Sequence, residues 1–420
     1  MKVLWITNTI FPDFAEALHI HKPVVGGWMY GLADALASCK NLKLHVATID
    51  TQLPPCSKSI RNIDFHLLKT SSRFHYDQQL ESQWKKLVDD IQPDLIHIHG
   101  TEYPHGLACM QANNNQKYVI SIQGLISVYS RYYLGGLSSG EILRSMTLRD
   151  VLKQDGIFRS AAKFKDRGKH EIEYIRKTRH VIGRTTWDKS HSYAINPEVN
   201  YHFCNEALRN KFYEAPSWKL ESAEPHTIFV SQSASPLKGL QQVIKALPII
   251  KHAFPNVKIK IAGPDKFRQP GFKEQLKKDG YGNYLQKLAR DLSVMDSIEF
   301  LGMLSEEEMI SQFQRSHVFV CPSSIENSPN SLGEAQLIGT PVIASYTGGI
   351  PDMVEHEQSG LLYRFEEYEM LAYFIKMVFS NDELAHKLSD CGISAAHKRH
   401  DRTVIRESTI QIYKEIVTSN

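Results

Sequence analysis

The sequence lacks the residue spacings that mark several common kinds of site. Its six cysteines are scattered and form no C-x-x-C pair, which indicates neither a disulfide framework nor a structural zinc site. G-x-G-x-x-G and G-x-x-x-x-G-K-[ST] are absent, so dehydrogenase and P-loop activities lose their main support. There is also no D-x-D pair to hold a metal ion. We therefore expect no metal and no cofactor.

Long apolar runs are missing as well. The apolar run within "KVLWIT" is too short for a signal peptide and is typical of a buried strand. No stretch approaches the roughly 20 apolar residues that a membrane helix needs. With 420 residues, 42% of them hydrophobic, and a net charge of +3, the composition indicates a globular protein of two domains. A reducing cytoplasm fits the cysteine usage. Any membrane contact is expected to be peripheral, on the inner face of the cell membrane, and no nucleic-acid partner is expected.

The order of strand and helix patterns predicts an α/β protein with two Rossmann-like, doubly wound parallel sheets that face a central cleft. Short β-branched runs such as "LKLHVAT" and "DLIHIHG" alternate with helical segments, and the alternation restarts near residue 226 with "HTIFVSQ". We predict an N-terminal domain over 1–205, a C-terminal domain over 226–400 and a linker near 200–225. The helical pattern at 401–418 is expected to pack back on the N-terminal domain.

One loop of the second domain is predicted to start a helix that binds an anion. Ligands of doubly wound sheets bind in loops at the carboxyl ends of the strands. Ser328 is predicted as the N-cap of the helix and Pro329 as its first residue. The amide N–H groups that then lack helical acceptors belong to Asn330, Ser331 and Leu332. Such a helix start favours a bound anion.

Two further helix starts point to the same kind of ligand. Ser235 and Pro236 are predicted to begin a helix that carries Lys238 in its opening turn. A cation there opposes the helix dipole unless an anion is bound; the alternative is a solvated lysine that points away. Gly26 and Gly27 precede a third helix, for which a plain turn is the alternative. Three such starts indicate a diphosphate.

Two glutamates flank the Ser-Pro-Asn-Ser-Leu-Gly stretch. Glu334 stands three residues after Ser331, so it is either a capping-box partner of Ser331 or a carboxylate past the first turn that binds the vicinal hydroxyls of a ribose. Glu326 precedes the helix and would repel a phosphate unless a polar group separates them. A sugar attached to the diphosphate fills that place. The alternative for Glu326 is an acidic residue favoured by the helix dipole.

These residues resemble glycosyltransferase family 4, whose members are retaining enzymes of GT-B architecture that use nucleotide-diphosphate sugars. The resemblance spans most of the chain and is strongest over 226–363. It rests on the spacing of Glu326 and Glu334 and on "EAQLIGTPVIAS", "SPLKG", "IAGPD", "FLGMLSEEEM", "TGGIPDMV" and "GGWMYGLADALA". It implies that a sugar is moved to a glycan acceptor of a bacterial surface polysaccharide, such as an O-antigen of lipopolysaccharide or a capsule.

The resemblance also implies roles for individual residues. Catalysis would fall to Glu326, which contacts the donor sugar, and to Lys238, which neutralises the departing diphosphate without a metal. The donor-binding set would be Glu334, Gly26, Gly27, Asn330, Ser331, Leu332, Gly263, Gly302 and Met303. In this set Glu334 would bind the ribose, the helix amides and the glycine pair would bind the diphosphate, and the loops at Gly263-Pro264-Asp265 and Gly302-Met303 would border the base. Front-side attack would require no dedicated general base.

Two positions depart from the family pattern. Many members carry Gly-Arg before the lysine, whereas here Gln232 occupies the matching place in the donor set. Members also often carry a histidine after the fourth strand that contacts the sugar, where this chain has Gln123 as its catalytic-site candidate. An amide still hydrogen-bonds a hydroxyl but does not titrate. These departures favour a weak or unusual donor site, and a noncatalytic relative would show them too.

Three residues are candidates for contact with the acceptor. His97 and His99 alternate along a presumed strand and are taken to face opposite sides, so that one is structural and His99 faces the acceptor beside Glu102. Arg184 follows another strand, where it meets an anionic acceptor or forms a surface ion pair.

Residues 141–170 contain eight Lys/Arg against four Asp/Glu, interleaved with Leu, Met, Ile and Phe. This basic amphipathic surface is predicted to dock on anionic lipid and admit a polyprenyl-diphosphate-linked glycan; the alternative is a solvated helical excursion packed on its own domain. Two other functions stay open. A nucleotide-sugar epimerase of the same build would need acid and base residues around the sugar, and a catalytically degenerate, nucleotide-sugar-binding partner protein would need none.

Overall fold

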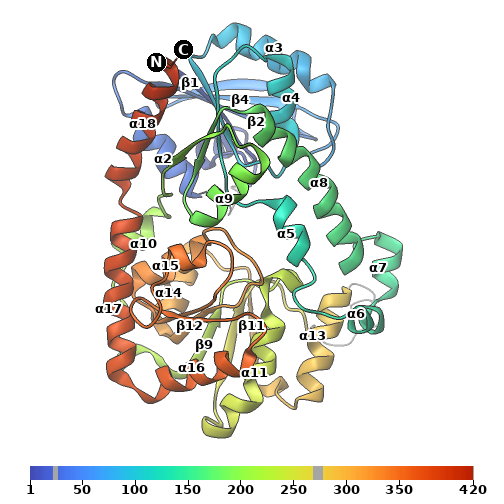
Figure 1. Cartoon of the computed structure of the whole chain (residues 1–420), viewed down its shortest axis with the longest axis vertical. Coiled ribbons are helices and arrows are strands. Elements are labelled where there is room, and N and C mark those ends of the chain that lie inside the picture. Colours follow the sequence, from blue (N-terminus) through green and yellow to red (C-terminus); the bar gives the residue numbers. More distant parts are fainter. Residues whose placement is uncertain (22–26, 268–277, 420) are drawn as a thin grey trace. The chain divides into compact units, whose positions relative to one another are not determined.

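The chain forms two compact units, each built on its own sheet (Figure 1). The computed structural model describes residues 1–21, 27–267 and 278–419. Unit 1 comprises Met1–Val128, Lys165–Asn210 and His400–Asn420, and unit 2 comprises Tyr129–Phe164 and Lys211–Arg399.

Unit 1 contains an eight-stranded sheet in the order β3-β4-β2-β1-β5-β6-β7-β8. Its strands are β1 (Lys2–Ile6), β2 (Lys43–Asp50), β3 (Cys56–Ile60), β4 (Ile63–Lys69), β5 (Leu95–His99), β6 (Tyr118–Ser121), β7 (His180–Gly183) and β8 (Asn200–Phe203). All neighbours are parallel except β3 and β4, which form an antiparallel hairpin at one edge. The β-branched runs predicted five of these strands. The hairpin was missed because β3, "CSKSI", is a polar edge strand with no buried residue.

Helices cover the sheet of unit 1, and the last of them comes from the C-terminus of the chain. The helices are α1 (Pro12–Ala17), α2 (Gly27–Ala37), α3 (Gln79–Ile91), α4 (His105–Ala112), α9 (Thr186–Ile195) and α18 (Arg402–Thr418). Tyr413 of α18 is fully buried, and its hydroxyl accepts a hydrogen bond from Trp5 Nε1 at 2.9 Å. The same hydroxyl lies 2.5 Å from His97 Nδ1. The C-terminal helix therefore belongs to the core of unit 1.

Unit 2 contains a six-stranded, fully parallel sheet in the order β11-β10-β9-β12-β13-β14. Its strands are β9 (Glu224–Val230), β10 (Lys258–Ala262), β11 (Ile298–Gly302), β12 (Ser316–Cys321), β13 (Val342–Ser345) and β14 (Leu361–Tyr363). Its helices are α11 (Leu240–Ala253), α13 (Gly280–Asp291), α14 (Glu306–Arg315), α15 (Asn330–Ile338), α16 (Tyr368–Ser380) and α17 (Asp382–Arg399), with 3₁₀ turns η1 (Leu220–Ser222), η2 (Pro236–Lys238), η3 (Met295–Ser297) and η4 (Ile350–Asp352). The central strand β12 is buried at every residue.

Residues 129–164 pack on unit 2, although the sequence analysis counted them with the domain over 1–205. They include α6 (Ser139–Ser145) and α7 (Leu148–Lys153), while α5 (Ile126–Tyr132), α8 (Ile157–Lys177) and α10 (Asn210–Glu214) each contribute residues to both units. Asn283 of α13 donates to the Ser145 carbonyl at 3.0 Å, and the Gly280 amide donates to Asp150 at 3.2 Å. These contacts join residues that are far apart in the sequence. The sequence therefore contains no local pattern that would predict this domain boundary.

In each sheet the order of the strands reverses at one point. The strands that directly follow the first strand lie on one side of it, and the later strands lie on the other. That switch point lies between β1 and β5 in unit 1 and between β9 and β12 in unit 2. Ligands of doubly wound sheets bind in the loops that follow such strands. Among the helices of the described residues, none has both the length and the apolar character needed to cross a bilayer.

Candidate functional site

The switch point of unit 2 brings together two of the three residues predicted to be catalytic. Lys238, from the loop after β9, donates from Nζ to Oε1 of Glu326, from the loop after β12, at 2.6 Å. Ser323 donates its hydroxyl to the same carboxylate oxygen at 2.9 Å. The side chains of Lys238 and Glu326 are 22% and 10% exposed, so the pair is shielded but still reachable. A polyanion that entered here would find an ammonium group held in place.

The loop after β9 differs from the predicted helix start. Ser235 and Pro236 begin the 3₁₀ turn η2, Lys238 ends it, and α11 starts only at Leu240. Gly239 separates the two with a φ of 75°, in the left-handed region. A Cβ at this position would lie 1.7 Å from the carbonyl oxygen of Pro322, so glycine lets the two switch-point loops touch. The prediction that Lys238 lies in the first turn of an α-helix was therefore wrong, but the loop still presents its ammonium group.

The helix after β12 starts one residue later than predicted. Pro329 is the N-cap of α15, without a side-chain cap, and Ser328 lies outside the helix. Ser331 is the second helical residue, which excludes the capping box with Glu334. Glu334 is buried and lies past the first turn, as the alternative required. The Leu332 amide donates to the Pro329 carbonyl at 3.0 Å, so the free end of the helix is formed by the amides of Asn330 and Ser331.

Other members of the predicted donor set lie in the same unit as this pair. Gln232 and Ser331 line one small cavity together with Lys238 and Glu326. At the ends of β10 and β11, the Gly263 amide donates to the Gly302 carbonyl at 2.7 Å, which joins the two loops predicted to border a base. Met303 is 74% exposed beside them.

The "TGGIPD" stretch supports the loop of Glu326 from its main chain. The Gly349 amide donates to the Glu326 carbonyl at 2.9 Å. Gly348 has a φ of 54°, and a Cβ there would lie 1.9 Å from the same carbonyl oxygen. The hydrogen bond from Gly349 was not predicted, because a contact between two separate loops leaves no spacing signal in the sequence. The hydrogen bond from Ser323 was not predicted either, although Ser323 lies only three residues before Glu326 in the same loop.

The switch point of unit 1 also joins two loops through a glutamate. Asn8, after β1, donates from Nδ2 to Oε2 of Glu102, after β5, at 2.9 Å. Arg167 of α8 donates from Nε to the Glu102 carbonyl at 3.0 Å. Burial raises the pKa of Glu102 to about 7, and the nearby carboxylate of Glu171 raises it as well. Such a carboxyl group is partly protonated near neutral pH.

The other two acceptor candidates lie in the interior of unit 1. His97 and His99 do not face opposite sides, because residues two apart on a strand share a face; their ring centroids are 3.8 Å apart. Both are buried, and burial lowers the pKa of His97 to about 3 and that of His99 well below its usual value. Arg184 is 2% exposed and forms an ion pair with Glu206, while its NH2 donates to the Ile122 carbonyl at 2.5 Å. The surface ion pair considered for Arg184 is thus a buried one, and neither His99 nor Arg184 is placed to meet an acceptor.

Gln123 and the glycine pair complete the sequence-predicted set. Gln123 follows β6 in unit 1, where it is half-buried with its Nε2 3.8 Å from the sulfur of Met29. Gly27 is the first residue of α2, and Gly26 lies outside the described residues. Among the described residues, no three His, Cys, Asp or Glu side chains gather as they would around a metal ion.

Two family models match the chain, one to each of its halves. Residues 214–394 match the model "Glycosyl transferases group 1", and residues 16–131 match "Glycosyl transferase 4-like". An uncharacterized glycosyltransferase of Methanocaldococcus jannaschii is 25% identical over 177 residues, which is 42% of each chain. The chain spans less than half the length of the curated relatives it matches first.

Solved structures share the fold over the whole chain. Sucrose-phosphate synthase from Thermosynechococcus elongatus is similar with a TM-score of 0.74 at 16% identity, covering 100% of both chains. HepE of Anabaena, in complex with UDP and glucose, is similar with a TM-score of 0.66 at 16% identity, covering 99% of this chain and 100% of the other. These neighbours confirm the GT-B fold class. With its group 1 and 4-like domains on that fold, the chain belongs to the glycosyltransferase family.

Proposed function

We propose that the protein is a retaining glycosyltransferase that takes a sugar from a nucleotide-diphosphate sugar bound at the switch point of unit 2. The observation that carries this proposal is the Lys238–Glu326 pair, 2.6 Å apart beside the start of α15. Without a donor, the ammonium group is neutralised by the carboxylate. A diphosphate offers the same ammonium a stronger anion, and the carboxylate becomes free to accept hydrogen bonds from the donor sugar.

The proposed chemistry is electrostatic. The diphosphate gains negative charge as it departs, and Lys238 and the amides of Asn330 and Ser331 stabilise that charge with groups already in place. Glu334 binds the ribose, and the Gly263 and Gly302 loops border the base. Because these groups supply positive charge to the leaving group themselves, we propose that transfer needs no metal. The UDP complex of the similar HepE structure supports a nucleotide-sugar donor.

The donor test compares three variants with the wild type. Release of nucleotide diphosphate from labelled donor should fall about 10²–10³-fold in Lys238→Ala and in Glu326→Ala, the range for loss of a group that stabilises developing charge. Lys287→Ala, at an exposed position on α13, should retain wild-type turnover. Wild-type turnover in both site variants contradicts the proposal. A thermal-shift panel of UDP-, GDP- and ADP-sugars identifies the base, and EDTA should leave turnover unchanged.

The degenerate alternative rests on one observation. Gln232 lines the cavity of Lys238 and Glu326 where family members carry an arginine, which leaves one cation fewer for the diphosphate. A noncatalytic partner protein would show a donor-dependent thermal shift with no release of nucleotide diphosphate. The same two measurements therefore separate the enzyme from this alternative.

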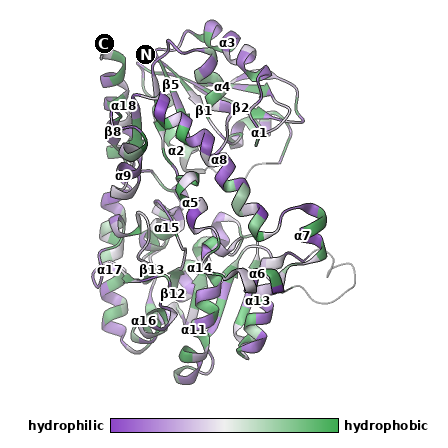
Figure 2. Cartoon of the chain, turned by 45° about the vertical axis from the view of Figure 1, so that its right-hand side comes forward, coloured by the Kyte–Doolittle hydropathy of each residue, from purple (hydrophilic) through white to green (hydrophobic). Residues whose placement is uncertain are grey.

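We further propose that α6 and α7 dock on an anionic membrane on the cytoplasmic side, next to a polyprenyl-diphosphate-linked glycan that acts as the acceptor in surface polysaccharide synthesis. Large apolar side chains are exposed here, with Leu143, Leu148 and Leu152 60%, 63% and 75% exposed. Figure 2 shows hydrophobic residues on these helices among hydrophilic ones. Basic residues lie between them along the chain, Arg144 and Lys153 among them. An exposed apolar patch with cations nearby fits the boundary of an anionic bilayer.

Arg167, although it lies within residues 141–170, does not belong to this surface. Its guanidinium donates to the Glu102 carbonyl and lies 4.9 Å from the ring centroid of Tyr103, within unit 1. The informative variant is Leu148→Ser with Leu152→Ser, which should lower co-sedimentation with anionic vesicles roughly tenfold. Val404→Ser, at an apolar residue of α18 that is 56% exposed, is the control. Equal sedimentation of all three proteins contradicts the proposal.

A further inference from the structure

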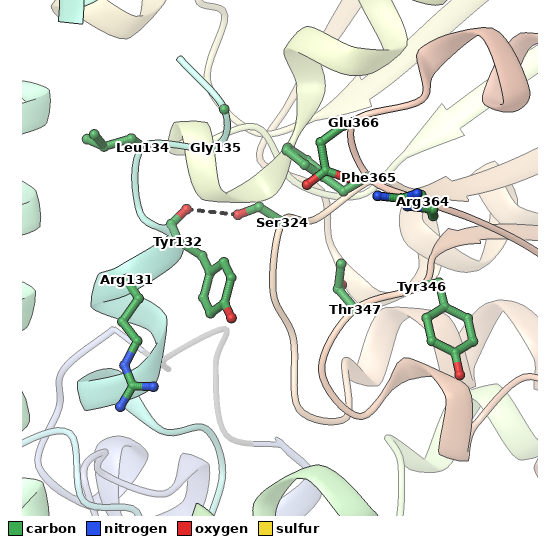
Figure 3. Close-up of a pocket in the computed structure, with 11 residues that line it drawn as sticks. Arg131, Tyr132, Leu134, Gly135, Ser324, Tyr346, Thr347, Arg364, Phe365 and Glu366 are labelled. Carbon is green, nitrogen blue, oxygen red and sulfur yellow. Dashed lines mark hydrogen bonds between the residues drawn. The ribbon is translucent and has the colours of Figure 1, made fainter. Parts of the chain in front are cut away.

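Unit 2 contains a cavity of about 420 Å³, and none of the predicted donor residues that the structure describes lines it. Its walls come from the C-terminal end of α5 and the residues that directly follow it, from the loop after β12, and from the segments after β13 and β14. Figure 3 shows the residues that line it, among them Arg131, Tyr132, Tyr346, Thr347, Arg364 and Glu366.

The cavity shares a loop with the Lys238–Glu326 pair but uses different side chains. Ser324, two residues before Glu326, donates its hydroxyl to the Tyr132 carbonyl at 3.0 Å, and its amide donates to the Leu237 carbonyl at 2.8 Å. Thr347 donates its hydroxyl to the Ser323 carbonyl at 3.2 Å. Within the described part of the chain, no residue lines both this cavity and the one around Lys238 and Glu326. A ligand here would therefore lie next to a donor sugar without competing for its phosphates.

Two aromatic side chains give the cavity the character of a carbohydrate site. Tyr132 and Tyr346 are 46% and 61% exposed, which leaves their ring faces open to a ligand. Figure 3 shows them on either side of the opening, with Ser324 and Thr347 between them. The C–H face of a sugar ring packs on an aromatic face, and the ring hydroxyls bind polar groups at its edge. Thr347 and the carboxylate of Glu366 are such groups.

Two guanidinium groups favour a ligand that carries negative charge. Arg131 and Arg364 both line the cavity and are exposed. The nearest acidic partner of Arg364 is Glu367, at a loose 3.8 Å. For Arg131, no ion pair is recorded with any residue that the structure describes. Guanidinium groups bind phosphate and carboxylate through paired hydrogen bonds, and two of them exceed the single charge of Glu366.

We infer that this cavity binds a saccharide that carries an anionic group, either phosphate or carboxylate. The inference that this saccharide is the acceptor rests on the proposed function, because it depends on a donor sugar at Glu326. The binding itself does not.

Binding is tested on the full chain without nucleotide, by calorimetry with three neutral hexoses, their uronates and their 6-phosphates, and with inorganic phosphate. At least one acidic sugar should bind about tenfold more tightly than its neutral parent and than inorganic phosphate. Arg364→Gln should remove that preference and leave the neutral sugars unchanged, whereas Tyr346→Ala should weaken all sugars. The matched controls, Arg290→Gln on α13 and Tyr373→Ala on α16, should bind like the wild type.

Three results overturn the inference: no sugar binds at millimolar concentration, neutral and acidic sugars bind equally, or inorganic phosphate binds as tightly as the sugars. The failure of the proposed function is distinguishable from these. If no nucleotide sugar binds but acidic sugars do, the donor proposal fails and the cavity assignment stands. If nucleotide-sugar affinity in Arg364→Gln equals that of the wild type, the two sites are separate.

Discussion

The switch points of the two units hold a glutamate in equivalent positions but give it different partners. In unit 1, Asn8 from the loop after β1 donates to Glu102 from the loop after β5 at 2.9 Å. In unit 2, Lys238 from the loop after β9 donates to Glu326 from the loop after β12 at 2.6 Å. The first strand and its central neighbour are thus tied together by a neutral amide in one unit and by an ammonium group in the other.

The partner decides what each carboxyl group is suited to do. The amide of Asn8 brings no charge, so burial dominates and raises the pKa of Glu102 to about 7. At Glu326 the ammonium of Lys238 compensates the negative charge directly. Unit 2 therefore holds a charge pair, whereas unit 1 holds a carboxyl group that takes up a proton near neutral pH. The same position in the fold does not imply the same chemistry.

The largest effect is expected from removing a buried charge of unit 1, which tests whether that charge stabilises the fold. Arg184→Ala should lower the free energy of unfolding by about 3–5 kcal/mol, because it leaves the carboxylate of Glu206 largely buried and unpaired. Urea denaturation measures this, and Arg290→Ala, at an exposed position on α13, should change it by less than about 0.5 kcal/mol. Adding Glu206→Gln should restore part of the loss. If Arg184→Ala leaves the free energy of unfolding unchanged, the charge of Arg184 does not stabilise the fold.

A smaller effect tests how the main chain of Glu326 is held. Gly348→Ala should cost about 1–3 kcal/mol through its positive φ, and the clash with the Glu326 carbonyl should add a further loss of stability and a loss of donor turnover. Gly302→Ala is the matched control for stability, since it also has a positive φ, 78°, but its Cβ would meet no atom within 4 Å. Thermal unfolding of both variants isolates the contact. Equal destabilisation by both would remove the role given to Gly348.

The smallest effect tests the proton on Glu102. The pKa in the folded state, about 7, lies above the ordinary value of 4.5, so the folded state binds this proton more tightly than the unfolded state. That contribution to stability is fully present below pH 4.5 and is lost as the pH rises to 7. Glu102→Gln keeps a hydrogen-bond acceptor for Asn8 but cannot ionise.

The stability of Glu102→Gln relative to the wild type should therefore rise by about 1–2 kcal/mol between pH 5 and pH 8. Unfolding by urea at several pH values measures the difference, and Glu407→Gln on the exposed face of α18 should show no such trend. A flat difference would mean that the nearby Arg167 or solvent already compensates the charge of Glu102.

The predicted site residues that the structure brings together are those whose signal is local. Glu326, Lys238 and the amides of Asn330 and Ser331 stand in short motifs at the ends of apolar strands, and the fold of unit 2 gathers them at one switch point. The helix starts were misplaced by one to four residues, because a Ser-Pro pair marks the end of a loop without deciding whether a 3₁₀ turn comes first.

The residues predicted worst were single polar side chains near strand ends. The sequence places Arg184 at the surface, as a contact of an acceptor or a member of a surface ion pair, but its partner is Glu206 in the interior. His99 was assigned the wrong face because the two-residue period of a strand was misapplied. A lone polar residue has no repeated pattern, so its surroundings decide its role.

The sequence by itself determined the parallel sheets and the positions along the chain where the proposed donor residues stand, because strand period, β-branched runs and motif spacing act between near neighbours. Only the tertiary structure decided which charge meets which: Lys238 with Glu326, 88 residues apart, and Asn8 with Glu102, 94 residues apart. It also decided that residues 129–164 pack on unit 2. Such pairings follow from how strands are ordered in a sheet, and that order depends on burying the whole chain at once.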